Sequence, residues 1–458
     1  MQVRHIRARL TKVWDQLRTS FWFIPTTMVG AAILLAFTTI AIDEQLRFEF
    51  VENLGWLYTG DSDGARLLLS TVASSIIGIA GVTFSITIAA LTMASSQFGP
   101  RLLRNFVRDV GNQCVLGTFI ATFIYCLLIL RTIRGSEEST FVPHISVTVG
   151  VILAIASIGV LIYFIHHVAM SIQADNVINR ASNDLNTVIK QIHPLPNNND
   201  PEQPQVPEEQ SHLLSLNRRS YTVVSCTTGY IQVIDRHTLL QIAIKHNMVI
   251  EFLHCPGDFV VRDDAIAMIW VIDRKPENID TEITNNIIIG KQRTLIQDIR
   301  FAINQVVEVG VRALSPGIND PFTAITCIDQ LTAALCQIVR RQAVSTYCYD
   351  DALQLRIIFK AVQFEEIVDT AFGLLRQYGR TNTEVILRLL TSIATVVDCT
   401  SDQSQRDVLI RQATIIAHDA REGLTNRHDR EIITTYYQNS FQPLTQDDYS
   451  VTDKVTTQ

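Results

Sequence analysis

Four long apolar runs within the first 171 residues constrain the fold of this chain more than any other feature. Each is long enough to cross the roughly 30 Å of hydrocarbon in a bilayer, which takes about 20 apolar residues in a helix. Only 18% of the residues are charged, against about 25% in average proteins. The sequence therefore excludes a purely soluble, fibrous or disordered chain. The expected spans cover residues 21–42, 67–98, 114–130 and 145–170.

Basic residues near the ends of the spans predict their orientation. Arginines gather in the N-terminus and in the loop after the second span, whereas the first loop is rich in Asp and Glu. We therefore expect both termini, and everything after the fourth span, to be cytoplasmic. The eight cysteines include no C-x-x-C pair, which is typical of structural thiols in a reducing compartment. No metal site and no cofactor is expected.

The predicted fold class is a membrane α-helical part with four transmembrane helices plus a cytoplasmic α+β region, in which a small β-rich unit precedes a helical unit. Within the helical unit, residues 349–377 are expected to form one helix, and the chain after 438 a loose tail. The expected segments are a basic N-terminus (1–20), the membrane domain (21–170), a helical extension (171–193), a Pro-rich linker (194–217), the β-rich unit (218–290), the helical unit (291–430) and a flexible tail (431–458).

The second span carries a stripe of small and hydroxylated residues. Residues at this three-and-four spacing share one face of a helix. The simpler interpretation is a packing seam inside the bundle, because small residues let membrane helices approach closely. The functional interpretation is a pore, with several subunits placing the stripe around an axis. The members of the stripe are Ser74, Gly78, Gly81, Ser85, Thr92 and Ser96.

A short amphipathic helix is expected after the second span, where Gly99 and Pro100 end it. Arg101, Arg104 and Arg108 share one face of this basic elbow. The simpler interpretation is an anchor at the membrane surface. The alternative is an arginine ring at a pore mouth, which favours anions.

The string SPGINDP joins two predicted helices. Gly317 is expected to be left-handed after the first helix, Asp320 to cap the second and Pro321 to begin it. A helix stop followed by a helix start explains every residue of this joint except Arg312 and Asn319. A Gly-bearing loop at a helix N-terminus also suits an anion, but the Asp320 carboxylate opposes one there.

The sequence gives no positive indication of an enzyme. It has no nucleotide fingerprint, no HExxH and no Ser-His-Asp order. The weak catalytic candidates are Asp298 and Asp329, which we expect to face one another across a helix pair. The net charge of −7 and the lack of a basic patch in the soluble half argue against nucleic acid as a partner. The expected partners are the lipid bilayer and further copies of the chain. Neither an ion nor a small-molecule ligand is indicated.

Two stretches carry a resemblance to known proteins: GVTFSITIAALTMASSQFGPRLLRNFVRD and TLIQDIRFAINQVVEVGVRALSPGINDPFTAITCIDQL. Both resemble a bacterial family of predicted membrane proteins, the domain of unknown function 2254, and the similarity covers about residues 15–430. The resemblance implies an integral protein of the bacterial cytoplasmic (inner) membrane. It implies no activity and no catalytic residue. The family's motif positions here are Ser95, Gln97, Phe98, Arg101, Gln297, Asp298, Phe301, Arg312, Ser315, Pro316, Gly317, Asn319, Asp320 and Pro321.

Two functions are consistent with these features. The first is an oligomeric channel or transporter-like pore lined by the second span. No Asp, Glu, Lys, Arg or His lies within the first three spans, which disfavours an ion-coupled pump. The alternative is a membrane-anchored sensor or scaffold whose cytoplasmic unit binds a ligand or protein around the SPGINDP joint.

Overall fold

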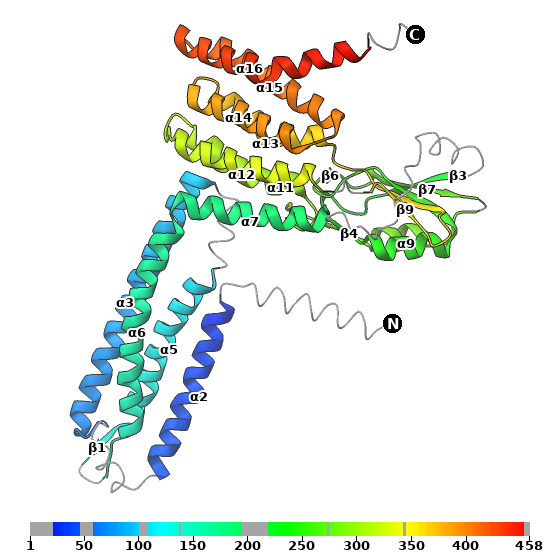
Figure 1. The fold of residues 1–458 in the computed structure, drawn as a ribbon. Helices are drawn as coiled ribbons and strands as arrows, with labels where there is room; N and C mark the ends of the chain where they lie inside the picture. The colour runs from blue at the N-terminus through cyan, green and yellow to red at the C-terminus, as the bar shows by residue number, and fades with distance from the viewer. Residues whose placement is uncertain are drawn as a thin grey trace. The chain divides into compact units, whose positions relative to one another are not determined.

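The computed structural model describes residues 22–45, 58–99, 109–136, 139–193, 219–272, 274–341 and 345–452. The chain divides into two compact units, Met1–Asn176 and Val177–Gln458, and each is described by itself (Figure 1). Some sequence predictions lie outside the described residues. These are the basic N-terminus 1–20, the Pro-rich linker 194–217 and the elbow arginines Arg101, Arg104 and Arg108.

The first unit is a bundle of long apolar helices in which α5 packs against the other three. Two glycines mark close approaches. A Cβ on Gly117 of α5 would lie 2.5 Å from the sulfur of Met28, and one on Gly150 of α6 would lie 2.9 Å from a methyl group of Leu69. Small residues thus bring these helices together. The bundle consists of α2 (Phe23–Gln45), α3 (Ser62–Phe98), α5 (Val110–Thr132) and α6 (His144–Ser171), with a short hairpin of β1 (Arg134–Ser136) and β2 (Ser139–Phe141) before α6.

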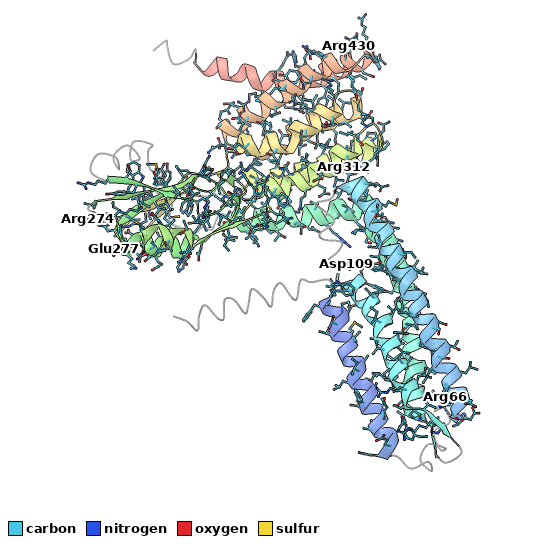
Figure 2. All side chains as sticks on the ribbon, turned by 180° about the vertical axis from the view of Figure 1, so that it is seen from behind. Arg66, Asp109, Arg274, Glu277, Arg312 and Arg430 are labelled. Carbon is cyan, nitrogen blue, oxygen red and sulfur yellow. The ribbon has the colours of Figure 1, made fainter. Side chains whose placement is uncertain are left out.

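Polar groups tie the bundle together at both ends. Asp43 of α2 accepts hydrogen bonds from the backbone N–H groups of Ile145 and Ser146, both at 2.9 Å, which satisfies free donors at the start of α6. At the opposite end, Asp109 caps α5 through the N–H of Gly111 at 2.8 Å and lies 3.1 Å from His167 Nε2. Figure 2 labels Asp109 at this end and Arg66 at the other.

The β-rich part of the second unit contains two sheets around one apolar core. The five-stranded sheet has the order β3-β7-β5-β10-β9, with β5 and β10 parallel and the other pairs antiparallel. The three-stranded sheet has the order β6-β4-β8. The elements are β3 (Arg219–Val224), β4 (Gly229–Ile234), α9 (Arg236–Lys245), β5 (Met248–Phe252), β6 (Phe259–Val260), β7 (Ala265–Val271), α10 (Ile279–Thr284), β8 (Ile287–Gly290), β9 (Tyr347–Tyr349) and β10 (Leu355–Ile358).

The rest of the second unit is a stack of helix pairs. Figure 1 shows α7 below the pair α11 and α12, followed by α13 with α14 and then α15 with α16. Apolar faces such as Ile303, Val306 and Val307 of α11 fill the spaces between layers. The helices are α7 (Ala174–Ile192), α11 (Ile299–Ala313), α12 (Pro321–Val339), α13 (Phe364–Gly379), α14 (Thr383–Cys399), α15 (Gln403–Gly423) and α16 (Arg427–Thr452).

Two predictions from sequence are corrected here. The expected helix 349–377 is wrong in its first part, because β9 ends at Tyr349 and β10 follows before α13 begins at Phe364. The β strands therefore extend into the segment expected to be wholly helical. The chain from 431 is also not a loose tail up to Thr452, since α16 continues that far and buries Ile433 and Phe441.

Among the residues that the structure describes, five helices are long and apolar enough to cross a membrane, rather than the four predicted. Four of them form the bundle of the first unit. The fifth is α12, which lies in the second unit and packs against α11 and α14. By length and composition the chain is therefore a membrane protein with several apolar helices and a small sheet region.

Candidate functional site: the outer face of α3 and the α11–α12 joint

The stripe of small residues on α3 faces away from the bundle. All six of its members are exposed. The face that α3 turns toward its own bundle is a different set of residues on the opposite side of the helix. The interpretation of the stripe as a seam inside one bundle is therefore wrong. The buried face consists of Ala65, Leu69, Ala73, Ile76, Ala80, Thr83, Ala90, Ala94 and Phe98.

The outer stripe is open and its hydroxyl groups have local partners. A Cβ added to Gly78 or Gly81 would meet no atom within 4 Å. The hydroxyls of Ser85 and Thr92 each donate to the carbonyl four residues earlier, at 2.9 Å. A hydroxyl that donates to its own helix can face lipid without an unsatisfied donor, and its oxygen can still accept a hydrogen bond. The stripe is flanked by exposed apolar side chains, namely Ile77, Val82, Phe84, Ile86, Ile88 and Met93.

The end of α3 matches the sequence prediction. Gly99 follows the last residue, Phe98, with a φ of 108°, and its N–H donates to the carbonyl of Ser95 at 3.2 Å. A positive φ of this kind favours glycine. Phe98 is buried, Ser95 and Gln97 are partly buried, and Arg101 lies outside the described residues.

The motif residues at the start of α11 are Gln297, Asp298 and Phe301, and the first of them joins strand β4 to the helix stack. The side chain of Gln297 accepts from the N–H of Ile234 at 2.9 Å and donates to the carbonyl of the same residue at 3.2 Å. Gln297 thus replaces a missing strand partner at the end of β4. Phe301, in the first turn of α11, packs against the guanidinium of Arg293, which is 5.4 Å from the ring centre.

Asp298 is the most buried acid of this motif, with 2% of its side chain exposed. It caps α11 by accepting from the N–H of Phe301 at 2.9 Å and forms a two-point ion pair with Arg293. The turn before β6 approaches it closely, since a Cβ on Gly257 would lie 2.2 Å from a carboxylate oxygen. Asp298 is therefore engaged in holding a turn, a cap and a cation together.

Arg300 extends this clamp to α13. It donates to Asp258 of the same turn and, at 3.1 Å, to Glu366 of α13. Burial raises the pKa of Asp258, but the N–H of Cys255 and the Arg300 guanidinium outweigh it and leave that pKa below its ordinary value. Sequence reasoning missed Asp258 and Arg293, although the turn string CPGD marks the first.

At the SPGINDP joint, two features predicted from the sequence are present and a third is corrected. Asp320 caps α12 by accepting from the N–H and hydroxyl of Thr323, at 3.1 and 2.6 Å, and Pro321 begins the helix as predicted. The left-handed residue, however, is Asn319 with a φ of 49°, and Gly317 does not have a positive φ. Asn tolerates this conformation better than most residues. Gly317 is exposed, with nothing within 4 Å of an added Cβ.

The remaining joint residues either have partners within the fold or lie exposed on the surface. Arg312 forms an ion pair with Glu308 at 3.6 Å, and the Ser315 carbonyl accepts from the N–H groups of Ile318 and Asn319. Pro316 is exposed.

The two acids considered as catalytic candidates have separate partners. Asp329 pairs with Arg388 of α14, whereas Asp298 pairs with Arg293. The expectation that these acids face one another is therefore wrong. Among the described residues, no group of three His, Cys, Asp or Glu side chains is placed to hold a metal ion.

These features define an integral membrane protein: a bundle of long apolar helices joined in one chain to a unit of two small sheets and stacked helices. The chain belongs to the family described as "Predicted membrane protein (DUF2254)", whose model matches residues 18–395. It is 28% identical over 431 residues to a protein of Mycobacterium bovis and, equally, to one of Mycobacterium tuberculosis, both described as uncharacterized. These matches cover 93% of this chain and 81% of each relative. No solved structure matches the chain.

Proposed function

We propose that this protein assembles into an oligomeric channel in which the α3 helices of several subunits line a pore. The observation that supports the proposal is the outward direction of the small, polar stripe on α3. Exposed Ser and Thr oxygens suit a water-filled path better than lipid. The apolar residues on both flanks of the stripe provide packing surfaces for neighbouring subunits, which leaves the stripe itself toward the axis.

The length of α3 is consistent with this role. Its 37 residues extend about 55 Å at roughly 1.5 Å per residue, which exceeds the hydrocarbon thickness. The helix therefore tilts or projects beyond the bilayer. Either arrangement lets α3 form both a pore wall and its mouth.

The proposed topology has four spans, with α12 outside the membrane. Polar side chains connect α12 to helices on several sides: Asp329 pairs with Arg388, and Gln330 accepts from Ser182 of α7 at 2.7 Å. A helix that faces lipid rarely carries charged side chains that pair with neighbouring helices. A helix buried between soluble helices is apolar over much of its surface without crossing a membrane. With four spans, the arginine-rich ends are cytoplasmic, which suits a bacterial inner-membrane protein with both termini inside.

The first measurement is the mass of the purified complex in detergent, after subtraction of the detergent. We expect a closed ring of several subunits, and conductance when that ring is placed in a planar bilayer between potassium chloride solutions. The double variant Gly81→Leu with Ser85→Leu fills the stripe and should lower the conductance at least tenfold.

The matched control is Val82→Leu with Met93→Leu, which alters exposed apolar residues beside the stripe and should conduct like the parent. A monomeric mass would contradict the proposal, and so would unchanged conductance in the stripe variant.

The alternative is a membrane-anchored sensor or scaffold that binds a ligand or protein at the α11–α12 joint. The exposure of Pro316, Gly317 and Asn319 favours it. However, Gln297, Asp298 and Asp320 are already engaged by backbone and side-chain partners within the fold. A thermal-shift screen of residues 212–440 against metabolite pools tests this function, and no shift with any pool would count against it.

A further inference from the structure

At one end of the second unit, three large apolar side chains are exposed. Phe322, in the first turn of α12, is 78% exposed, and Ile318 in the preceding joint is 41% exposed. Tyr378, in the last turn of α13, is 52% exposed. The surfaces of soluble proteins rarely expose several large apolar residues together unless a protein, ligand or membrane binds there.

Helix directions place these residues at one end of the unit. Three hydrogen bonds join α7 to the α12 region, and the residue numbers rise together along both segments, so the two helices run parallel. Both therefore begin at the same end, here termed the leading end. Figure 2 labels Arg312 near this end and Arg274 and Glu277 at the other end of the unit. The bonded pairs are Ser182 with Gln330, Asn186 with Gln337, and His193 with Arg341.

The helices α11 and α13 end where α7 and α12 begin. They also run parallel, since Arg300 meets Glu366 near their starts and Gly310 approaches Leu375 further along. The joint after α11 and the last turn of α13 thus both lie at the leading end. Tyr378 is consequently at the same end of the unit as Ile318 and Phe322.

The leading end is also the end that the chain enters from the apolar helix α6. Only Ile172 and Gln173 separate α6 from α7. The segment from Ser171 to Val177 spans at most about 20 Å even when fully extended. If α6 crosses the bilayer, the first residues of α7 are held within that reach of the leaflet from which α6 emerges, and the start of α12 lies beside them.

We propose that the leading end rests in the headgroup layer of that leaflet, with Phe322, Ile318 and Tyr378 as its apolar contacts. Aromatic rings with a polar atom favour this layer, and exposed apolar residues gain free energy by entering its inner boundary. The exposed Arg380 beside Tyr378 suits lipid phosphates. The proposal depends on α6 spanning the membrane and does not depend on a pore.

The test is site-specific photo-crosslinking in the full-length protein, reconstituted in vesicles of phosphatidylcholine and phosphatidylglycerol. Phe322 is replaced by p-benzoylphenylalanine, and the control has the same group at Leu353. Leu353 is equally open, at 73% exposure, but lies in the β9–β10 turn, which follows the other end of α12. We expect at least tenfold more lipid adduct from position 322 than from position 353.

Two results would overturn the proposal: an adduct yield at 322 no higher than at 353, or crosslinks at 322 mainly to a second copy of the chain. Phe322→Ser should leave the melting temperature unchanged, because the side chain packs against little of the protein, and this confirms that position 322 tolerates substitution. The outcome is independent of the channel proposal, since lipid adducts form whether or not the protein conducts.

Discussion

The Asp298 carboxylate and the Arg293 guanidinium form a two-point ion pair, with Nε and Nη2 at 2.7 and 2.8 Å from the two oxygens. The carboxylate is almost fully buried and also caps α11. An acid in this position stabilises the boundary between the sheets and the helix stack. Such geometry explains why a polar motif precedes an otherwise apolar helix.

Replacement of Asp298 should therefore destabilise the second unit. Asp298→Ala removes a helix cap and leaves a partly buried guanidinium without its anion, which together cost about 3 kcal/mol. Thermal unfolding of the full-length protein in detergent measures the loss. Asp351→Ala, at an exposed acid, is the control and should change stability by less than about 0.5 kcal/mol. Equal melting temperatures for the two variants would contradict the assigned role.

Two glycines should respond oppositely to alanine. Gly257→Ala places a Cβ 2.2 Å from Asp298 at a φ of 94°, and both the clash and the strained backbone should lower the melting temperature by several degrees. Gly317→Ala meets open space at an ordinary φ, so reduced freedom of the unfolded chain should leave stability equal or raise it by about 0.5 kcal/mol. A marked loss with Gly317→Ala would show that the joint needs glycine for its conformation.

Stability should depend on pH through Asp258. Its pKa is lowered in the folded protein, so its contribution is fully present above the unfolded value of about 4 and is lost as the pH falls through the folded value. The melting temperature of the parent should thus fall more steeply below pH 4 than that of Asp258→Asn, which is less stable at pH 7. Parallel curves for the two proteins across pH 3 to 7 would refute this dependence.

Labelling from one side of the membrane should distinguish four spans from five. Gly317 precedes α12 and Leu353 follows it, and both are exposed. In a background with Cys226→Ser, a membrane-impermeant maleimide should reach Gly317→Cys and Leu353→Cys from the same side of a sealed vesicle. Access from opposite sides would mean that α12 crosses the bilayer.

Local sequence patterns were sufficient for most helices but not for long-range partners. The apolar runs predicted the bundle helices because a membrane span depends mainly on its own composition. The segment containing Leu355–Ile358 was expected to be helical, yet it forms β10 by pairing in parallel with β5, about 100 residues earlier. Nothing within the segment itself indicates that partner, and tertiary pairing outweighs local preference.

The candidate site was likewise predictable only as far as local sequence patterns allow. The three-and-four spacing correctly grouped Ser74 through Ser96 on one face, but spacing alone does not say whether a face meets its own bundle or the outside. The orientation of α3 is set by the alanines and Leu69 on the opposite side, which pack against α5 and α6. The stripe therefore faces outward. At the joint, the cap by Asp320 was predictable from residue type, whereas the left-handed conformation of Asn319 depends on how the loop closes.

The parallel pairing of β10 with β5 also has a consequence for biosynthesis. In the order β3-β7-β5-β10-β9, β5 has no neighbour on one side until the ribosome has released residues 355–358. Until then the nascent chain presents the apolar strand Met248–Phe252 as an open edge, which is a template for association with other chains. The helices α11 and α12 are synthesised within that interval, before β10. Premature termination between α12 and β10 should therefore yield an aggregation-prone fragment rather than a smaller folded protein.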